Sequence, residues 1–189
     1  DISDLVIASA DALGGMGGTG YGAGPAGRGG DAQGGTAQLI VTDHAIGPLF
    51  SIMSAEATGG ADGFSAGSTG ANGGDAVGGT ARLEVIGEAG SAVVLSANLR
   101  ASATGGEGGF GTISYTDPTL APAGGAGGTG TGGTQEIIAR DGATILIDAD
   151  NSSAIAELGS VGTGGGGGRG ASNDMGTASG GEGGAAGTG

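Results

Sequence analysis

The chain has 189 residues, of which 52 are glycine and none is cysteine, and only 3% are aromatic. This composition excludes an ordinary globular core rich in leucine and aromatic rings, and it excludes disulfides, thiolate metal sites and a cysteine nucleophile. The net charge of −14 opposes binding to nucleic acids and to anionic lipid surfaces, so we expect neither as a partner.

We expect neither a membrane-spanning segment in this sequence nor a signal peptide in its first residues. No apolar run approaches the roughly 18 residues that cross a bilayer, so we expect no membrane insertion. The first residues, DISDLVIASADAL, carry acidic side chains where a secretory signal peptide carries basic ones.

Internal repetition is the strongest feature of the sequence. GGDAQGGTAQLIV at 29–41 recurs as GGDAVGGTARLEV at 73–85 and, more loosely, as GGTGTGGTQEIIA at 127–139. A second signature, SAEATGG ending at Gly60, recurs as SANLRASATGG ending at Gly106. We therefore predict one repetitive array over residues 1–189 with about three and a half units, and we expect it to be a window of a longer repeat protein. One threonine in each copy of the first signature marks the units: Thr36, Thr80, Thr134 and Thr188.

The apolar runs alternate with the period of a β-strand. In TAQLIV (36–41), Ala37, Leu39 and Val41 share one face, and TARLEV (80–85) repeats this pattern. The second run of a unit alternates in the same way in SAVVLSA (91–97) and TILIDA (144–149). This period and the β-branched residues predict half-buried strands, and we expect no α-helix.

Turn-forming residues separate the two runs of each unit. They are Ile46-Gly47-Pro48, the segment 87–90 and Asp141-Gly142. An Asp-Gly step is typical of a hairpin and equally suits the corner of a solenoid. Since one pair of strands cannot bury its apolar face alone, successive units must stack. The predicted fold is all-β, a tandem-repeat, β-solenoid-like stack of short strand pairs.

Glycine-rich tracts at 14–35, 59–79, 105–133 and from 159 onward connect these strands, and glycine recurs in them at every third position. A left-handed extended helix of the polyproline II type has three residues per turn, and a glycine face lets such helices pack closely. Four prolines are too few for a collagen triple helix. Two interpretations remain: ordered polyglycine II-like helices bonded through their backbone amides, which we favour, and loose loops.

Candidate chemistry is sparse, and we expect no enzyme, no catalytic or cofactor-binding residue and no small-molecule substrate. His44 is the only histidine, which favours an exposed turn residue over a catalytic or metal-binding one. Ser91 and Ser96 have no base nearby in the sequence, and no phosphate-binding loop motif is present. Thr129 and Thr131 form one isolated Thr-x-Thr step, which argues against an ice-binding face.

Calcium is the one cofactor that the acidic residues leave open. Asp31 and Asp75 each follow a Gly-Gly step, and Asp148 and Asp150 precede Asn151. Oxygen ligands of this kind suit calcium, but neither the repeated nonapeptide of calcium-binding β-rolls nor the EF-hand pattern is matched. The alternative, which we favour, is that these acids are solvated and keep the protein soluble.

The pattern GG-x-A-x-GGTA-x-L-x-V, followed by SA-x-ATGG, resembles the long glycine-rich strand-repeat proteins of Gram-negative bacterial surfaces, which are similar to filamentous adhesins. The resemblance implies export and a fibre or adhesin character. We therefore expect a structural segment of an extracellular or cell-surface fibre that associates with copies of itself or with neighbouring repeats. The alternatives are a surface adhesin whose glycine-rich excursions bind a ligand, and a calcium-stabilised secreted repeat.

Overall fold

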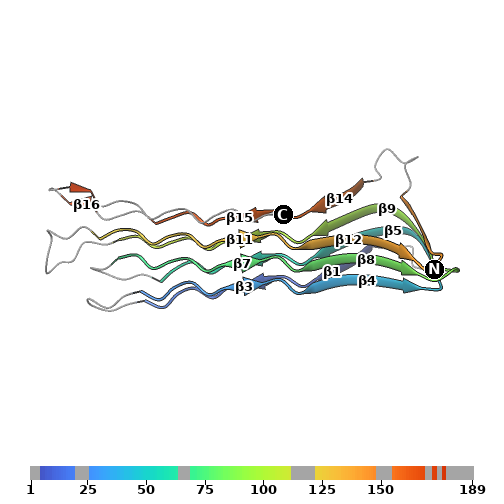
Figure 1. Ribbon diagram of the computed structural model, residues 1–189, viewed down its shortest axis with the longest axis horizontal. Helices are drawn as coiled ribbons and strands as arrows, with labels where there is room; N and C mark the ends of the chain where they lie inside the picture. The colour runs from blue at the N-terminus through green and yellow to red at the C-terminus, as the bar shows by residue number, and fades with distance from the viewer. Residues whose placement is uncertain are drawn as a thin grey trace.

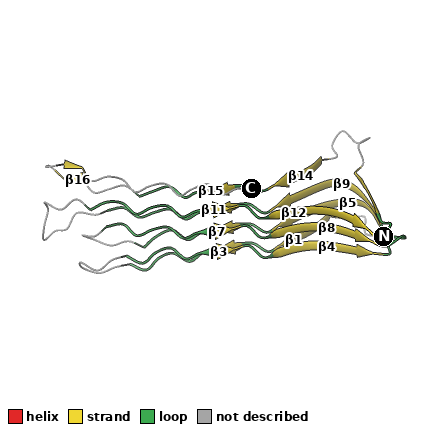
Figure 2. Ribbon diagram, in the orientation of Figure 1, coloured by secondary structure: helices red, strands yellow, loops and turns green. Residues whose placement is uncertain are grey.

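The computed structural model describes residues 5–19, 26–63, 69–111, 122–147, 155–168, 172–173 and 176–177. No helix occurs in these ranges, and the strands are short (Figure 2). In chain order they are β1 (Leu5–Ser9), β2 (Ala12–Leu13), β3 (Ala32–Gln33), β4 (Thr36–Thr42), β5 (Ala45–Ser54), β6 (Ala57–Thr58), β7 (Ala76–Val77), β8 (Thr80–Ile86), β9 (Ser91–Arg100), β10 (Ala103–Thr104), β11 (Gly130–Thr131), β12 (Thr134–Arg140), β13 (Thr144–Ile147), β14 (Ile155–Gly159), β15 (Gly162–Thr163), β16 (Ser172–Asn173) and β17 (Gly176–Thr177).

Almost every strand pairs in parallel with the same strand of the next unit. One sheet has the order β1-β5-β9-β13, with β14 also on β9, and a second has the order β4-β8-β12. Two narrow sheets of two-residue strands, β2-β6-β10-β15 and β3-β7-β11, continue them. Only the β16–β17 pair is antiparallel among the described residues. We call the sheet of β1, β5, β9, β13 and β14 the outgoing sheet and that of β4, β8 and β12 the returning sheet.

The register of the sheets follows the sequence repeat. Thr36 pairs with Thr80, and Thr80 with Thr134, so the first three marker threonines stand side by side. Thr188 lies outside the described residues. Within a unit, β4 and β5 do not pair with each other, because they belong to different sheets. The turn between them is therefore a corner, and no hairpin forms there.

The structure confirms that the described chain is all-β. The described sheets are open and do not close on one another, so they do not form a closed solenoid. Figure 1 shows how each unit runs along the whole long axis and back: strands lie at one end, and narrower undulating tracts extend from them. The units stack across this axis.

The outgoing strands and tracts form one layer of the molecule, and the returning ones form a second. The side chains between the two layers become smaller along the long axis. Between the outgoing and returning sheets lies an aliphatic core that includes Met53, Leu83 and Leu99, each with 0% exposure. Between the narrow sheets the core is alanine alone: Ala32, Ala57, Ala76 and Ala103, with Ala12 partly buried against them. Beyond these, the facing residues are glycines, so the layers can approach until their backbones touch.

The corners use residues that accept a left-handed backbone. Asp43, Gly87 and Asp141 directly follow β4, β8 and β12, with φ of 50°, 91° and 55°. Asp and Gly tolerate this region better than other residues, which explains why the predicted turns at 87–90 and Asp141-Gly142 are confirmed.

The predicted turn at Ile46-Gly47-Pro48 is wrong, because these residues lie inside β5. The first corner is instead at Asp43-His44. Gly47 has a φ of 145° and Pro48 has no amide hydrogen to donate, so the pair produces an irregularity in the register of β5 against β9.

Candidate functional site

The most distinctive arrangement in the molecule is a hydrogen-bond ladder that joins the glycine tracts. We call 14–19, 59–63, 105–111 and 164–168 the outgoing tracts, and 26–31, 69–75 and 122–129 the returning tracts. Six consecutive bonds of 2.7–2.9 Å link all seven, each from an amide N–H to a carbonyl oxygen: Gly165 to Gly128, Gly128 to Gly106, Gly106 to Gly74, Gly74 to Gly60, Gly60 to Gly30 and Gly30 to Gly15. The ladder alternates between outgoing and returning tracts, so it ties the two layers together.

Further bonds of the same kind recur three residues along each tract. The amide of Gly168 donates to Gly125 and that of Gly125 to Gly109, while the amide of Gly63 donates to Gly27 and that of Gly27 to Gly18. Neighbouring outgoing tracts are also bonded directly, for example from the Gly17 amide to the Ala61 carbonyl. The described glycine tracts are therefore packed and paired, and the loose-loop interpretation fails for them.

Close packing explains why the residues between the tracts are glycines. A Cβ added at Gly60 would lie far closer than 3.0 Å to the carbonyl oxygen of Gly15. The same clash would occur between Gly106 and Gly60 and between Gly165 and Gly106. Backbone atoms on both sides cannot move aside cheaply, so any side chain at these positions forces the tracts apart.

Side chains leave the tracts outward, at the third position of each turn. Met16 is 80% exposed and Phe110 is 62% exposed, and Glu107 and Thr129 are also exposed. These positions differ from unit to unit, whereas the packed positions between them are glycine in most turns. The outward positions are where the units can vary without disturbing the ladder.

The calcium candidates Asp31 and Asp75 form part of a charged cluster with Arg28. The Arg28 guanidinium contacts Asp31 at 2.9 Å and Asp75 at 2.6 Å. Asp31 Oδ1 accepts the Asp75 amide at 2.8 Å, and Asp75 Oδ1 accepts the Thr129 amide at 2.7 Å and the Thr129 hydroxyl at 2.8 Å. Each acid thus binds the backbone of the next unit, a role that the interpretation as purely solvated acids missed.

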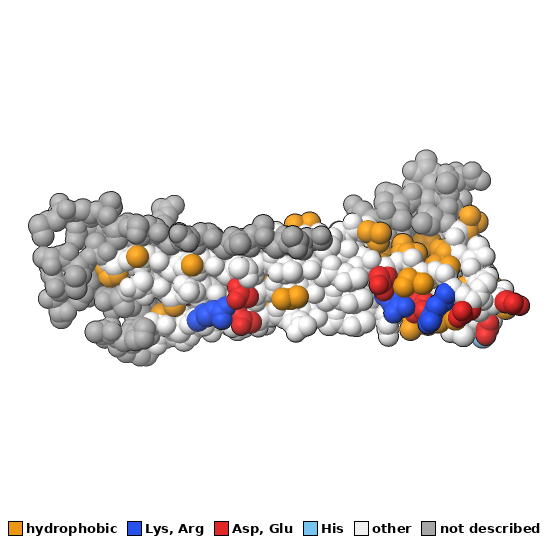
Figure 3. Space-filling view, in the orientation of Figure 1, with side chains coloured by type: hydrophobic (Ala, Val, Ile, Leu, Met, Phe, Trp, Pro, Cys, Tyr) orange, Lys and Arg blue, Asp and Glu red, His pale blue; other side chains and the backbone are white. Residues whose placement is uncertain are grey.

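Asp75 is stabilised as a carboxylate by this geometry. The amide and hydroxyl of Thr129 lower the pKa of Asp75 more than burial raises it, and Arg28 lowers it further. Figure 3 shows charged side chains gathered in two groups on one face of the molecule. The Arg28 cluster and a second ion-pair network around Glu84 are the two groups that the distances define.

Two other carboxylates respond differently to their surroundings. Partial burial would raise the pKa of Asp11, but hydrogen bonds from the Ser54 and Ser9 hydroxyls and the Glu56 amide outweigh it and lower the pKa. Burial dominates at Asp62 and raises its pKa, opposed by one bond from the Ala71 amide. Asp11 therefore bridges β1 to the next unit, as Asp31 and Asp75 do farther along the tracts.

Glu84 is a buried, ion-paired carboxylate that the sequence did not predict. It lies on the outer face of β8 and is only 1% exposed. Arg82 contacts it at 3.0 Å, Arg140 of the neighbouring β12 pairs with its other oxygen, and Arg82 also contacts Glu136 at 3.5 Å. The alternation of charge in TARLEV and TQEIIAR, aligned by their threonines, is the signal that could have found this network.

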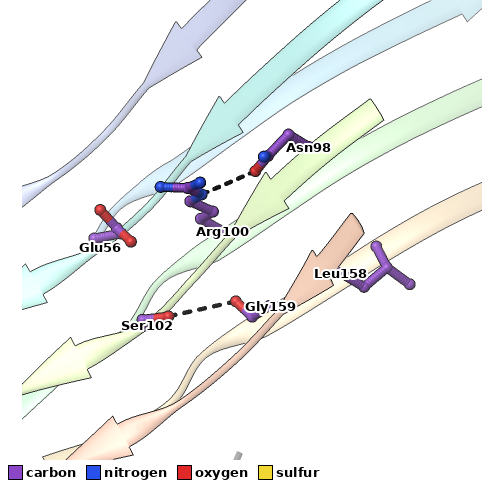
Figure 4. A pocket seen from close by; sticks show the side chains of 6 residues that line it. All are labelled: Glu56, Asn98, Arg100, Ser102, Leu158 and Gly159. Carbon is purple, nitrogen blue, oxygen red and sulfur yellow. Dashed lines mark hydrogen bonds between the residues drawn. The ribbon is translucent and has the colours of Figure 1, made fainter. Parts of the chain in front are cut away.

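A depression of about 270 Å³ lies on the outgoing side, where β14 meets β9. Figure 4 shows its lining: Arg100 donates to Asn98 at 2.9 Å, and the Ser102 hydroxyl points to the carbonyl of Gly159 at 3.5 Å. Glu56 and Leu158 complete the wall. The described lining thus contains one carboxylate, one guanidinium, one side-chain amide and one hydroxyl.

The remaining sequence candidates form no cluster among the residues that the structure describes. His44 is exposed at the first corner, where its Nδ1 lies 2.7 Å from the Thr42 carbonyl oxygen. Ser91 and Ser96 are in β9, and Asp148 and Asp150 lie outside the described residues. Over the part of the chain that the structure describes, no group of three or more His, Cys, Asp or Glu side chains could hold a metal ion.

Comparison with known proteins gives no relative. No protein-family model, no curated protein and no solved structure matches the chain. Within the described residues, none of the secondary structure is a helix long and apolar enough to cross a bilayer.

Proposed function

We propose that this chain is a structural, non-enzymatic segment of an extracellular or cell-surface fibre. The observation that carries the proposal is the continuous amide ladder across seven glycine tracts. A ladder that uses one residue per tract and excludes side chains provides mechanical cohesion and leaves no room for a substrate. Its partners would be copies of the same chain or neighbouring repeats.

We further propose that the tracts are polyglycine II-like helices and that the units stack as a β-solenoid does. The hydrogen bonds recur at intervals of three residues, as at Gly15 and Gly18 or Gly125 and Gly128. A polyproline II-type helix has three residues per turn and no internal hydrogen bonds, so all of its amides are available to its neighbours. Parallel pairing of equivalent strands, unit after unit, supports the solenoid-like stack.

The extracellular or cell-surface location rests on the resemblance to bacterial surface repeat proteins and on composition. A chain with 19 acidic residues, no cysteine and few aromatic residues remains hydrated while its backbone carries the cohesion. The acids on the outer faces also oppose unwanted pairing along the sides of the sheets.

A surface adhesin is the second candidate function, and the outward positions of the tracts favour it. Met16, Glu107 and Phe110 project from a scaffold whose inner residues are fixed by packing. Different side chains on a rigid backbone can form a binding surface without altering the fold.

Electron microscopy of negatively stained, purified chain separates these functions. Filaments of uniform width that persist in EDTA would support the fibre. Single particles that bind to bacterial cells or to glycan-coated surfaces, and never associate with one another, would contradict the fibre and favour the adhesin. Collapse of the particles in EDTA, with recovery in calcium, would favour the calcium-stabilised repeat instead.

A further inference from the structure

One edge of the glycine ladder has sockets that no described residue fills. In the outgoing tracts, Gly15, Gly60, Gly106 and Gly165 occupy equivalent places: from Gly60 onward, a Cβ at each would strike the carbonyl of the preceding one. At Gly15 the same Cβ would meet nothing within 4 Å. Gly18 is likewise open, although a Cβ at its equivalents Gly63, Gly109 and Gly168 would meet an atom of the preceding outgoing tract far inside 3.0 Å. The first tract thus has the glycines of a packed tract, but no described residue packs against them on this side.

At the opposite edge, the apolar core has an exposed residue where the inner units have buried ones. Leu158 of β14 is the register partner of Leu99, which is in turn the partner of Met53. Leu99 and Met53 are 0% exposed, but Leu158 is 56% exposed. In the same register Ala8 of β1, at the first edge, is only partly buried. Burial is complete only where a unit has neighbours on both sides.

The two edges are complementary because equivalent strands of successive units pair in parallel, so each unit offers the same kind of edge to the next. In parallel pairing, a strand presents different backbone groups on its two sides, and each internal junction matches one side to the other. Among the strands that the structure describes, β1 has a partner on one side only, and so does β14. The surface around β14 and 164–168 therefore matches the surface around β1 and 14–19, as neighbouring units match each other within the chain.

We propose that this chain associates head to tail with a second copy, the edge of β1, β2 and 14–19 of one copy receiving the edge of β14, β15 and 164–168 of the other. The carbonyl of Gly165 of the second copy would lie in the socket at Gly15, as the carbonyl of Gly106 lies against Gly165 within the chain. Ala8 would cover Leu158 of the second copy. This contact deepens the proposed fibre function, on which it rests, by naming the surface through which the fibre grows.

A second copy fits this edge better than an unrelated protein does. An unrelated partner would need glycine at the contacting positions and the same register, whereas the chain itself supplies both at its other edge. A contact between two different surfaces that does not close generates an open filament, which would grow across the long axis seen in Figure 1.

Substitution of the open glycines tests the contact. Gly15→Val and Gly18→Val place side chains where nothing within 4 Å opposes them, at residues without positive φ, so each variant is expected to fold. Gly166→Val is the matched control: it is also open, but it is equivalent to the outward residues Met16 and Glu107. Sedimentation velocity over a range of concentrations measures the association, and far-UV circular dichroism reports the fold.

We expect the wild-type chain and Gly166→Val to form concentration-dependent oligomers and filaments, and Gly15→Val and Gly18→Val to sediment as folded monomers. Leu158→Asp, at the opposite edge, should also be monomeric. A mixture of Gly15→Val with Leu158→Asp retains one intact pair of edges, so it should form dimers with twice the monomer mass and nothing larger.

Three results would overturn the head-to-tail contact. They are a wild-type chain that stays monomeric, a Gly15→Val variant that associates as the wild type does, and loss of association in Gly166→Val. If filaments survive Gly15→Val and Gly18→Val, the fibre function stands and another surface makes the contact. If no variant forms filaments and the monomers bind surfaces, the fibre function fails as well.

Discussion

At Gly106 the hydrogen that replaces a side chain faces the carbonyl oxygen of Gly60, while the residue after it, Glu107, projects into solvent. This two-way division recurs at most turns of the described tracts and separates glycines that packing requires from residues that it leaves free. Gly166 belongs to the second class, since a Cβ there meets nothing within 4 Å. Composition alone counts both classes as glycine.

Alanine substitution should distinguish the two classes. We expect Gly106→Ala to lower the free energy of unfolding by about 1–3 kcal/mol or more, because the new Cβ overlaps a backbone carbonyl. Gly166→Ala should be neutral or stabilising by up to roughly 1 kcal/mol, because it restricts the unfolded chain without a clash. Urea titration followed by circular dichroism measures both. Equal effects at the two positions would contradict the assignment.

The lowered pKa of Asp75 predicts how the free energy of unfolding depends on pH. Its pKa is lowered below 3.8 in the folded chain, so it stabilises the fold above pH 3.8 and loses that contribution as the pH falls through its folded value. Asp75→Asn should therefore flatten the loss of unfolding free energy below pH 3.8. Urea titrations of both proteins between pH 2 and 6 measure this slope.

Asp62 should affect the pH dependence of stability in the opposite direction to Asp75. Its pKa is raised, so its ionised form opposes folding and stability is regained as the pH falls through the raised value toward 3.8. Asp62→Asn should therefore raise the free energy of unfolding above that of the wild type near neutral pH, and the difference should shrink at pH 3, where the wild-type carboxyl group is protonated. Identical pH profiles for wild type, Asp75→Asn and Asp62→Asn would show that neither carboxyl group is perturbed.

At the scale of the element, β8 buries a charge that its neighbours replace with apolar residues. The register partners of Glu84 are Ile40 on β4 and Ile138 on β12. Glu84 is held by Arg82 and Arg140, of which Arg140 has a half-exposed side chain. Such a network gives little net stability, but removal of one partner leaves a buried charge without its counter-ion.

We expect Arg140→Ala to destabilise the chain by about 1–2 kcal/mol, less than for a fully buried pair because Arg140 is half exposed. Glu84→Leu should be neutral or stabilising, since it extends the isoleucine row. In the double variant, Glu84→Leu should suppress most of the cost of Arg140→Ala. Additive effects in this double-mutant cycle, measured by urea unfolding, would exclude the ion pair.

The elements were predictable from sequence where one residue's stereochemistry decides the outcome. Alternation in TAQLIV, the three-residue recurrence of glycine and the Asp141-Gly142 turn each reflect local geometry. The failure at Gly47-Pro48 has the same origin: a turn-like pair becomes an irregularity when the strand continues beyond it and its partner β9 is in place. Sheet membership, the bridging roles of Asp11 and Asp75 and the burial of Glu84 depend on which units lie side by side, which single residues do not specify.

At the scale of the whole molecule, the hydrogen-bond ladder between outgoing and returning tracts holds the glycine-rich end together, so cohesion is not confined to the strand-rich end. The core thins from Leu83 and Met53 to Ala57 and then to glycine, so apolar burial decreases along the long axis. Backbone hydrogen bonds of 2.7–2.9 Å, from amide N–H to carbonyl oxygen, continue through the glycine part and link all seven tracts. The glycine-rich end is therefore held by hydrogen bonds between packed backbones, whereas the strand-rich end has a side-chain core in addition to its strand hydrogen bonds.

This arrangement predicts that glycine amides in the tracts exchange with solvent as slowly as those of strands. In monomeric chain, the amides of Gly74 and Gly106 should be protected to a similar degree as those of Leu83 and Leu99, because each is bonded and buried in the central units. The amide of Gly15 should exchange rapidly, since only its carbonyl is bonded among the described residues. Hydrogen–deuterium exchange by NMR, referenced to rates in denaturant, measures all five. If Gly74 and Gly106 exchanged at denatured-state rates while Leu83 and Leu99 remained protected, the tracts would be loose in solution and the fibre would have to rely on its strands alone.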